Sequence, residues 1–123
     1  MKGFCDIHPT LKEKYKLALV TSTGPELVSH IEGLLSIYEK FDVVITSLDT
    51  NMHKPHPDPY IKAMNKLGFL SDECVVVEDS IQGIKAGKAA GCTVVALEGS
   101  IDKEFLKDAD YIISSLYDIQ NII

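Results

Sequence analysis

Hydroxyl, ammonium and carboxylate side chains each follow a short apolar run of this 123-residue sequence. They are Thr21 and Ser22 after the first run, Lys54 in a loop after the second, and Glu78 with Asp79 directly after the third. A hydroxyl can donate a hydrogen bond to a phosphate oxygen, and an ammonium group can offset negative charge on a phosphate or a transition state. Carboxylate oxygens are the ligands that Mg²⁺ prefers. These residue types would therefore suit a site that binds a phosphorylated anion beside a magnesium ion.

The same residues also have ordinary structural explanations. Thr21 could simply end a strand or cap a helix, and Lys54 could be a solvated loop charge. Glu78 and Asp79 could do no more than begin the next helix. The functional interpretation therefore depends on whether the three apolar runs are neighbouring strands whose ends meet.

Five apolar runs are predicted to form strands, because unbroken runs rich in β-branched residues are typical of strands covered on both faces. They are Leu17–Val20, Val43–Ile45, Val75–Val77, Thr93–Leu97 and Tyr111–Ile113. Helical patterns separate them, which predicts an α/β fold with a Rossmann-like open parallel sheet and helices on both faces. Ligands bind at the carboxyl ends of the strands in such sheets. The polar groups are therefore expected to converge on one rim.

Four helices are predicted between the strands from their end signals and apolar spacing. They begin near Thr23, Asp58, Ser80 and Asp102, and Gly68 and Gly91 stop the second and third. The side chains expected to face inward are Leu27, Val28, Ile31, Leu34, Leu35 and Tyr38 in the first helix, Ile61, Met64 and Leu67 in the second, Ile81, Ile84 and Ala89 in the third, and Phe105 and Leu106 in the fourth.

Composition sets the broad class of the protein. With 46% apolar residues, residues 1–123 suit a single domain with a real core. Twelve Lys and Arg against 18 Asp and Glu give a net charge of −6, and no basic cluster points to a nucleic acid or an anionic membrane. No run approaches the roughly 20 apolar residues of a membrane helix, and no signal peptide is recognised. Three unpaired cysteines, Cys5, Cys74 and Cys92, predict free thiols in a reducing cytoplasm.

Three segments resemble motifs of the haloacid dehalogenase-like hydrolase superfamily. LALVTST at 17–23 resembles the second motif, in which a strand ends in Thr or Ser. KPHPDPY at 54–60 resembles the third motif, in the form found in β-phosphoglucomutase-like and phosphoglycolate phosphatase-like members. VVVEDSIQGIKAGKAA at 75–90 resembles the fourth. The similarity covers about residues 16–113.

The resemblance implies a Mg²⁺-dependent phosphatase or phosphomutase that works through an aspartyl-phosphate on a small phosphorylated metabolite. By the same resemblance, Thr21 would hold the phosphoryl group, with Ser22 beside it. Lys54 would stabilise the nucleophile and the phosphate. Asp79 would bind Mg²⁺, and Glu78 would assist directly or through water.

The first motif of the family, D-x-D-G-(T/V) after an N-terminal strand, does not occur in this sequence, and neither does the cap domain that usually follows it. Asp6 and His8 can be laid over the two aspartates of that motif. The interpretation that we favour is that residues 1–15 are an irregular or degenerate segment, because only nine residues separate Ile7 from Leu17 and a parallel crossover usually needs a dozen or more. The nucleophile would then be missing or displaced, and turnover is expected to be weak or absent.

Loss of the first-motif strand would leave two unpaired inner edges, because that strand lies between the strands that end at Thr21 and Asp79. Gly3–Ile7, a second copy of the chain in a homo-oligomer, or another part of a longer protein could fill the gap. One alternative function is a non-catalytic module that binds Mg²⁺ and phosphate, or a protein partner. A receiver-like signalling domain is disfavoured, since Asp49 lies too far beyond Ile45 to end a central strand.

Overall fold

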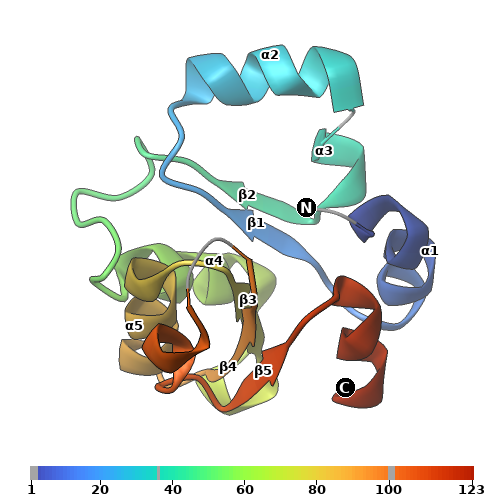
Figure 1. Cartoon of the computed structure of the whole chain (residues 1–123). Helices are drawn as coiled ribbons and strands as arrows, with labels where there is room; N and C mark the ends of the chain where they lie inside the picture. The colour runs from blue at the N-terminus through green and yellow to red at the C-terminus, as the bar shows by residue number, and fades with distance from the viewer. Residues whose placement is uncertain (1–2, 36, 100–101) are drawn as a thin grey trace.

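The computed structural model of the chain describes residues 3–35, 37–99 and 102–123, without the side chains of residues 31–37. Within these residues five short strands alternate with helices (Figure 1). The strands are β1 (Ala18–Val20), β2 (Val43–Ile45), β3 (Val75–Glu78), β4 (Thr93–Leu97) and β5 (Tyr111–Ile113). The α-helices are α1 (Phe4–Lys14), α2 (Pro25–Leu35), α3 (Ile37–Lys40), α4 (Asp58–Leu67) and α5 (Ile81–Ala89). Short 3₁₀ helices are η1 (Ser71–Glu73), η2 (Lys103–Leu106) and η3 (Leu116–Asn121). The predicted order of strands and helices is confirmed.

All of the strand pairs are parallel, as predicted, but the strands form two hydrogen-bonded groups. β1 pairs with β2, and β3, β4 and β5 pair in that order. Within the described residues no ladder joins β1 to β3, which lie on either side of the break (Figure 1). The two unpaired inner edges expected from the sequence are therefore present.

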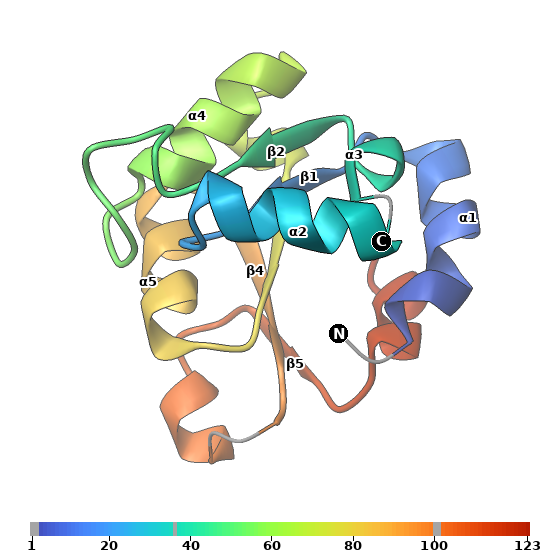
Figure 2. The ribbon, with the colours of Figure 1, turned by 90° about the horizontal axis from the view of Figure 1, so that it is seen from above.

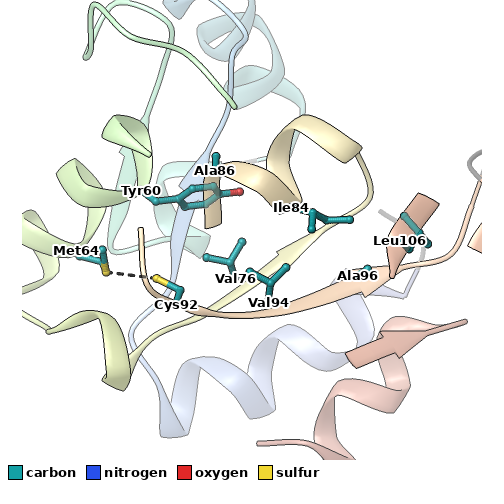
Figure 3. Packing of buried hydrophobic residues seen from close by; sticks show 9 residues of the cluster. All are labelled: Tyr60, Met64, Val76, Ile84, Ala86, Cys92, Val94, Ala96 and Leu106. Atoms are coloured by element: carbon teal, nitrogen blue, oxygen red, sulfur yellow. Dashed lines mark hydrogen bonds between the residues drawn. The ribbon is translucent and has the colours of Figure 1, made fainter. Parts of the chain in front are cut away.

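Side chains alternate between the two faces of the larger sheet, and each face has its own core. One core is made by α4, α5 and η2 on the sheet and contains Tyr60, Met64, Val76, Ile84, Ala86, Cys92, Val94, Ala96 and Leu106 (Figure 3). The other contains Ile7 from α1, Val95 and Ile113 from the sheet, and Leu116 and Ile119 from η3. Helices thus cover both faces, and α1 and η3 lie side by side in both views (Figures 1 and 2).

The N-terminal segment is a helix, so the expectation that residues 1–15 are irregular is wrong for Phe4–Lys14. The idea that Gly3–Ile7 fills the gap as a strand is also wrong, since these residues begin α1. Phe4, Ile7 and Leu11 recur at helical spacing and pack on the second core. Burial of this apolar stripe stabilises the helix although Pro9 lies within it.

Two helix ends follow the predicted signals, whereas Asp102 precedes η2 without a side-chain cap hydrogen bond. The Ser80 hydroxyl caps α5 by accepting a hydrogen bond from the N–H of Gly83, and Gly68 ends α4 at a φ of 82°. Val28, Met64, Ile84 and Leu106 face inward as predicted, whereas Leu27, Tyr38, Ile61, Ala89 and Phe105 are exposed. The predicted inward side chains of Ile31, Leu34 and Leu35 lie outside the described residues.

Asp42 ties α1 and the start of β1 to the segment before β2. Its carboxylate lies 2.7 Å from the Lys12 ammonium and accepts a 2.8 Å hydrogen bond from the N–H of Leu17. The Lys12 and Leu17 hydrogen bonds lower the pKa of Asp42, with the Lys12 bond the larger cause. A depressed folded-state pKa adds stability above the unfolded value of about 3.9, and that stability is lost as the pH falls through the folded value.

We therefore expect Asp42→Asn to lower the free energy of unfolding by about 1 kcal/mol at pH 7. The difference from wild type should fade as the pH falls through the lowered pKa of Asp42, because below it both proteins carry a neutral side chain at this position. Urea unfolding at a series of pH values measures this difference, with Asp72→Asn, an exposed carboxylate, as the control. A difference that persists unchanged at low pH would contradict the assignment.

Candidate functional site

The Lys54 ammonium bridges the break between the two groups of strands. It donates a 3.1 Å hydrogen bond to the carbonyl of Val20 at the end of β1, and it lies 3.2 Å from Oε2 of Glu78 at the end of β3. The Lys54 and Glu78 side chains are each only 12% exposed. A lysine from the loop after β2 therefore meets the carboxyl ends of β1 and β3, which we call the rim.

Tyr60 lies beneath this ion pair on the first turns of α4. The Lys54 ammonium is 5.0 Å from the centre of the Tyr60 ring, and the Tyr60 hydroxyl interacts with the Glu78 carboxylate. Only 8% of Tyr60 is exposed, and its side chain lies in the core with Met64 and Ile84 (Figure 3). Burial, and then the negative charge of Glu78, raise the pKa of the Tyr60 phenol, so it is a neutral donor at physiological pH.

The Glu78 carboxylate faces the first turn of α5 as well as Lys54. Its Oε2 atom accepts a 3.5 Å hydrogen bond from Ser80 Oγ, and a Cβ atom added to Gly83 would lie only 1.2 Å from it. Glycine at position 83 therefore makes room for the carboxylate. Burial raises the pKa of Glu78, and the Lys54 charge acts in the opposite direction.

The Thr21 hydroxyl lies just beyond β1. Its Oγ1 atom accepts a 3.1 Å hydrogen bond from the N–H of Thr23, so the hydroxyl hydrogen can still be donated to a ligand. Ser22, next to it, is exposed. The N–H of Ser47 donates to the carbonyl of Thr23 at 3.1 Å, which holds this loop against the loop after β2.

Asp79 is exposed and makes no hydrogen bond or ion pair within the described ranges. No group of three or more His, Cys, Asp or Glu side chains that could hold a metal is found among the residues that the structure describes. Because Glu78 is engaged with Lys54, Asp79 is the carboxylate of the pair best placed to accept a cation. The residues present thus supply only part of a magnesium shell.

Asp6 and His8, the residues laid over the first motif, do not lie at the rim. The Asp6 carboxylate accepts a hydrogen bond from the Tyr117 hydroxyl, and His8 Nε2 lies 2.7 Å from the carbonyl of Lys40. Both residues belong to α1, at the opposite end of the molecule from the loop after β2 (Figures 1 and 2). Asp6 is therefore not placed as a displaced nucleophile.

Two residues of this arrangement, Tyr60 and Gly83, were not among the sequence-predicted site residues. Both lie inside the quoted motif segments, as the last residue of KPHPDPY and the sixth of EDSIQG. Their positions could have been noted there, but nothing in the local pattern indicates that one supports Lys54 and the other makes room for Glu78.

Comparison with known proteins places the chain in a family. The sequence model described as "Haloacid dehalogenase-like hydrolase" matches residues 2–97. The chain belongs to this family. The match includes the second, third and fourth motif segments of this haloacid dehalogenase-like chain, which confirms the family resemblance drawn from the sequence.

Its relatives include phosphatases and phosphomutases. The chain is 39% identical over 102 residues to glycerol-1-phosphate phosphohydrolase 1 of Saccharomyces cerevisiae, covering 77% of this chain and 40% of that protein. A Thermotoga maritima structure described as a β-phosphoglucomutase matches with a TM-score of 0.87 and 28% identity, over 99% of this chain and 58% of that one. CbbY from Rhodobacter sphaeroides, solved in complex with phosphate, matches with a TM-score of 0.82 and 28% identity, over 93% and 53% of the two chains.

The haloacid dehalogenase-like chain spans about half the length of these relatives. Solved neighbours include both β-phosphoglucomutase-like and phosphoglycolate phosphatase-like proteins, as the form of the third motif indicated. Membership in this family also rules out the receiver-like signalling domain considered as an alternative.

Within the described ranges, no helix has both the length and the apolar character needed to cross a bilayer.

Proposed function

We propose that this chain carries the phosphate-binding half of a phosphatase or phosphomutase site that acts on a small phosphorylated metabolite with Mg²⁺ in the cytoplasm. The observation that supports this most directly is the Lys54 ammonium at the rim, which is held by Glu78 and by the carbonyl of Val20, the residue before Thr21. A positive charge that is largely shielded from water and held in place, together with a hydroxyl donor, is a strong binding element for a phosphate dianion.

The residues would divide the work in the following way. Thr21 would donate its hydroxyl hydrogen to one phosphate oxygen, and the exposed Ser22 could contact a second. Lys54 uses two of its three N–H donors on Val20 and Glu78, which leaves one for the phosphate. Asp79 would hold Mg²⁺ with Glu78 beside it, and the bound ion would neutralise phosphate charge.

The nucleophile is absent from this arrangement, so we propose that the chain turns over phosphomonoesters weakly or not at all by itself. The unpaired edges of β1 and β3 could accept an extended segment that carries the aspartate. A second copy of the chain could lend such a segment, in which case the active form would be an oligomer, or it could come from elsewhere in a longer protein.

The names of the relatives agree with this class of ligand. One relative is a glycerol-1-phosphate phosphohydrolase, and one solved neighbour contains bound phosphate. The alternative function, a module that binds Mg²⁺ and phosphate or a protein without chemistry, is favoured by the missing aspartate. Supplying a segment that carries the aspartate distinguishes the two functions, because only an enzyme site would then hydrolyse phosphomonoesters.

Isothermal titration calorimetry tests the proposal. The protein is titrated with inorganic phosphate, with and without Mg²⁺, and the affinity is measured. We expect measurable binding that Mg²⁺ strengthens, and a loss of about tenfold or more in affinity in Lys54→Ala, because a charge-assisted hydrogen bond is removed. Asp79→Asn should remove the effect of Mg²⁺. Lys14→Ala, which removes an exposed charge on α1, is the matched control. Equal affinity in wild type and Lys54→Ala would refute the site.

A further inference from the structure

We infer that Tyr60 is a positioning residue of the phosphate site, whose ring and hydroxyl together hold the Lys54 ammonium at the rim. This inference deepens the proposed function and rests on it for the phosphate measurements alone. Tyr60 touches both partners of the ion pair, and its side chain is also part of the hydrophobic core.

The ring supports the ammonium from below. The distance of 5.0 Å from Lys54 Nζ to the ring centre lies within the range of a cation–π contact. Such contacts gain strength when the cation is shielded from water, and the Lys54 side chain is only 12% exposed. The ring therefore stabilises the ammonium without using any of its N–H donors, so the third donor stays available for a ligand.

The hydroxyl acts on the other partner. It interacts with the Glu78 carboxylate, which also accepts from Ser80 and lies 3.2 Å from Lys54. With Tyr60 in place, Glu78 is held toward Lys54 rather than toward the exposed Asp79 side of the rim. Removal of the hydroxyl alone should weaken the restraint on Glu78. Removal of the ring as well should also weaken the support of the Lys54 ammonium.

The core anchors Tyr60 itself. Met64, one turn further along α4, and Ile84 and Cys92 belong to the same buried cluster (Figure 3). Lys54 lies in a loop, so its own backbone gives little restraint, whereas Tyr60 is fixed by packing. A change at Tyr60 should therefore alter Lys54 specifically, and a change at Met64 should alter only the packing.

The test uses Tyr60→Phe, which removes the hydroxyl, and Tyr60→Leu, which also removes the ring. Met64→Leu is the control, since it alters the same core without touching Lys54 or Glu78. Each folded protein is treated with a limiting amount of an acetylating reagent, and mass spectrometry gives the rate at Lys54 relative to the exposed Lys14. Inorganic phosphate affinity is measured in parallel by calorimetry.

We expect the relative acetylation rate of Lys54 to rise about threefold in Tyr60→Phe and about tenfold in Tyr60→Leu, and phosphate affinity to fall by similar factors. Met64→Leu should leave both within about twofold of wild type. If Lys54 is acetylated faster in the Tyr60 variants but the wild-type protein binds no phosphate, the positioning role is supported and the proposed function is refuted. Lys54 rates in both Tyr60 variants equal to that in Met64→Leu would overturn the inference. If Tyr60→Leu does not fold, Tyr60→Phe decides the result.

Discussion

Phosphatase activity should rise by about 1,000-fold or more when this chain is given a peptide of five apolar residues followed by D-x-D-G-T, because loss of a catalytic nucleophile costs at least that factor. β1 and β3 each belong to a parallel ladder and have an unpaired edge within the described residues, and cores cover both faces of the larger sheet. We therefore expect an added strand to be covered on both faces and to need apolar side chains. Its carboxyl end would lie at the rim beside Lys54, where the aspartate could attack a bound phosphomonoester.

Hydrolysis of p-nitrophenyl phosphate with Mg²⁺ measures this effect. The chain alone should show little more than background, and Asp6→Asn should behave like wild type because Asp6 contacts Tyr117 on the far side of the molecule. The matched control is the same peptide with its first aspartate replaced by asparagine, which should bind without restoring turnover. Robust activity of the chain alone that disappears in Asp6→Asn would show that the nucleophile is already present.

Gly83→Ala is expected to lower the free energy of unfolding by about 3–5 kcal/mol, the cost of breaking a buried ion pair by displacing one partner. The added Cβ would lie 1.2 Å from Oε2 and 2.0 Å from Cδ of Glu78, so the whole carboxylate must move. Lys54 would then keep the Val20 carbonyl and the Tyr60 ring as partners but lose its carboxylate. The higher helix propensity of alanine recovers no more than about 1 kcal/mol.

Urea unfolding gives the cost, and a double-mutant cycle identifies its cause. Gly99→Ala, where an added Cβ meets nothing within 4 Å, is the control and should change stability by less than about 0.5 kcal/mol. In a Glu78→Ala background the added Cβ no longer meets a carboxylate, so Gly83→Ala should lower the free energy of unfolding far less than it does in the wild type. Equal costs in the two backgrounds would mean that Glu78 does not occupy the space at Gly83.

Local sequence signals determined most of the framework. The five apolar runs became parallel strands within one residue of their predicted limits, and Ser80 and Gly68 ended helices as their side chains and backbone freedom require. The rule that parallel strands present their carboxyl ends at one edge predicts that Lys54 and Glu78 lie close together, as they do. These features depend on a few neighbouring residues each, which is why they can be read from the chain.

The N-terminal helix was missed because its signal is weak in the sequence. Pro9 favours a break, and the three apolar residues of the stripe are too few to outweigh it in isolation. They form a helix because Val95, Ile113 and Leu116, more than 80 positions away, supply the surface on which they pack.

Only the tertiary structure decided how the site is supported. The family resemblance gave Glu78 an assisting role at the metal, directly or through water, and gave Tyr60 no role. The structure adds that the Glu78 carboxylate lies between Lys54, Ser80 and Gly83, and that the Lys54 ammonium lies over the Tyr60 ring. The direction of a buried side chain is set by the burial, charge and free space that several distant segments create together. That environment exists only after the chain has folded, so sequence spacing alone cannot specify it.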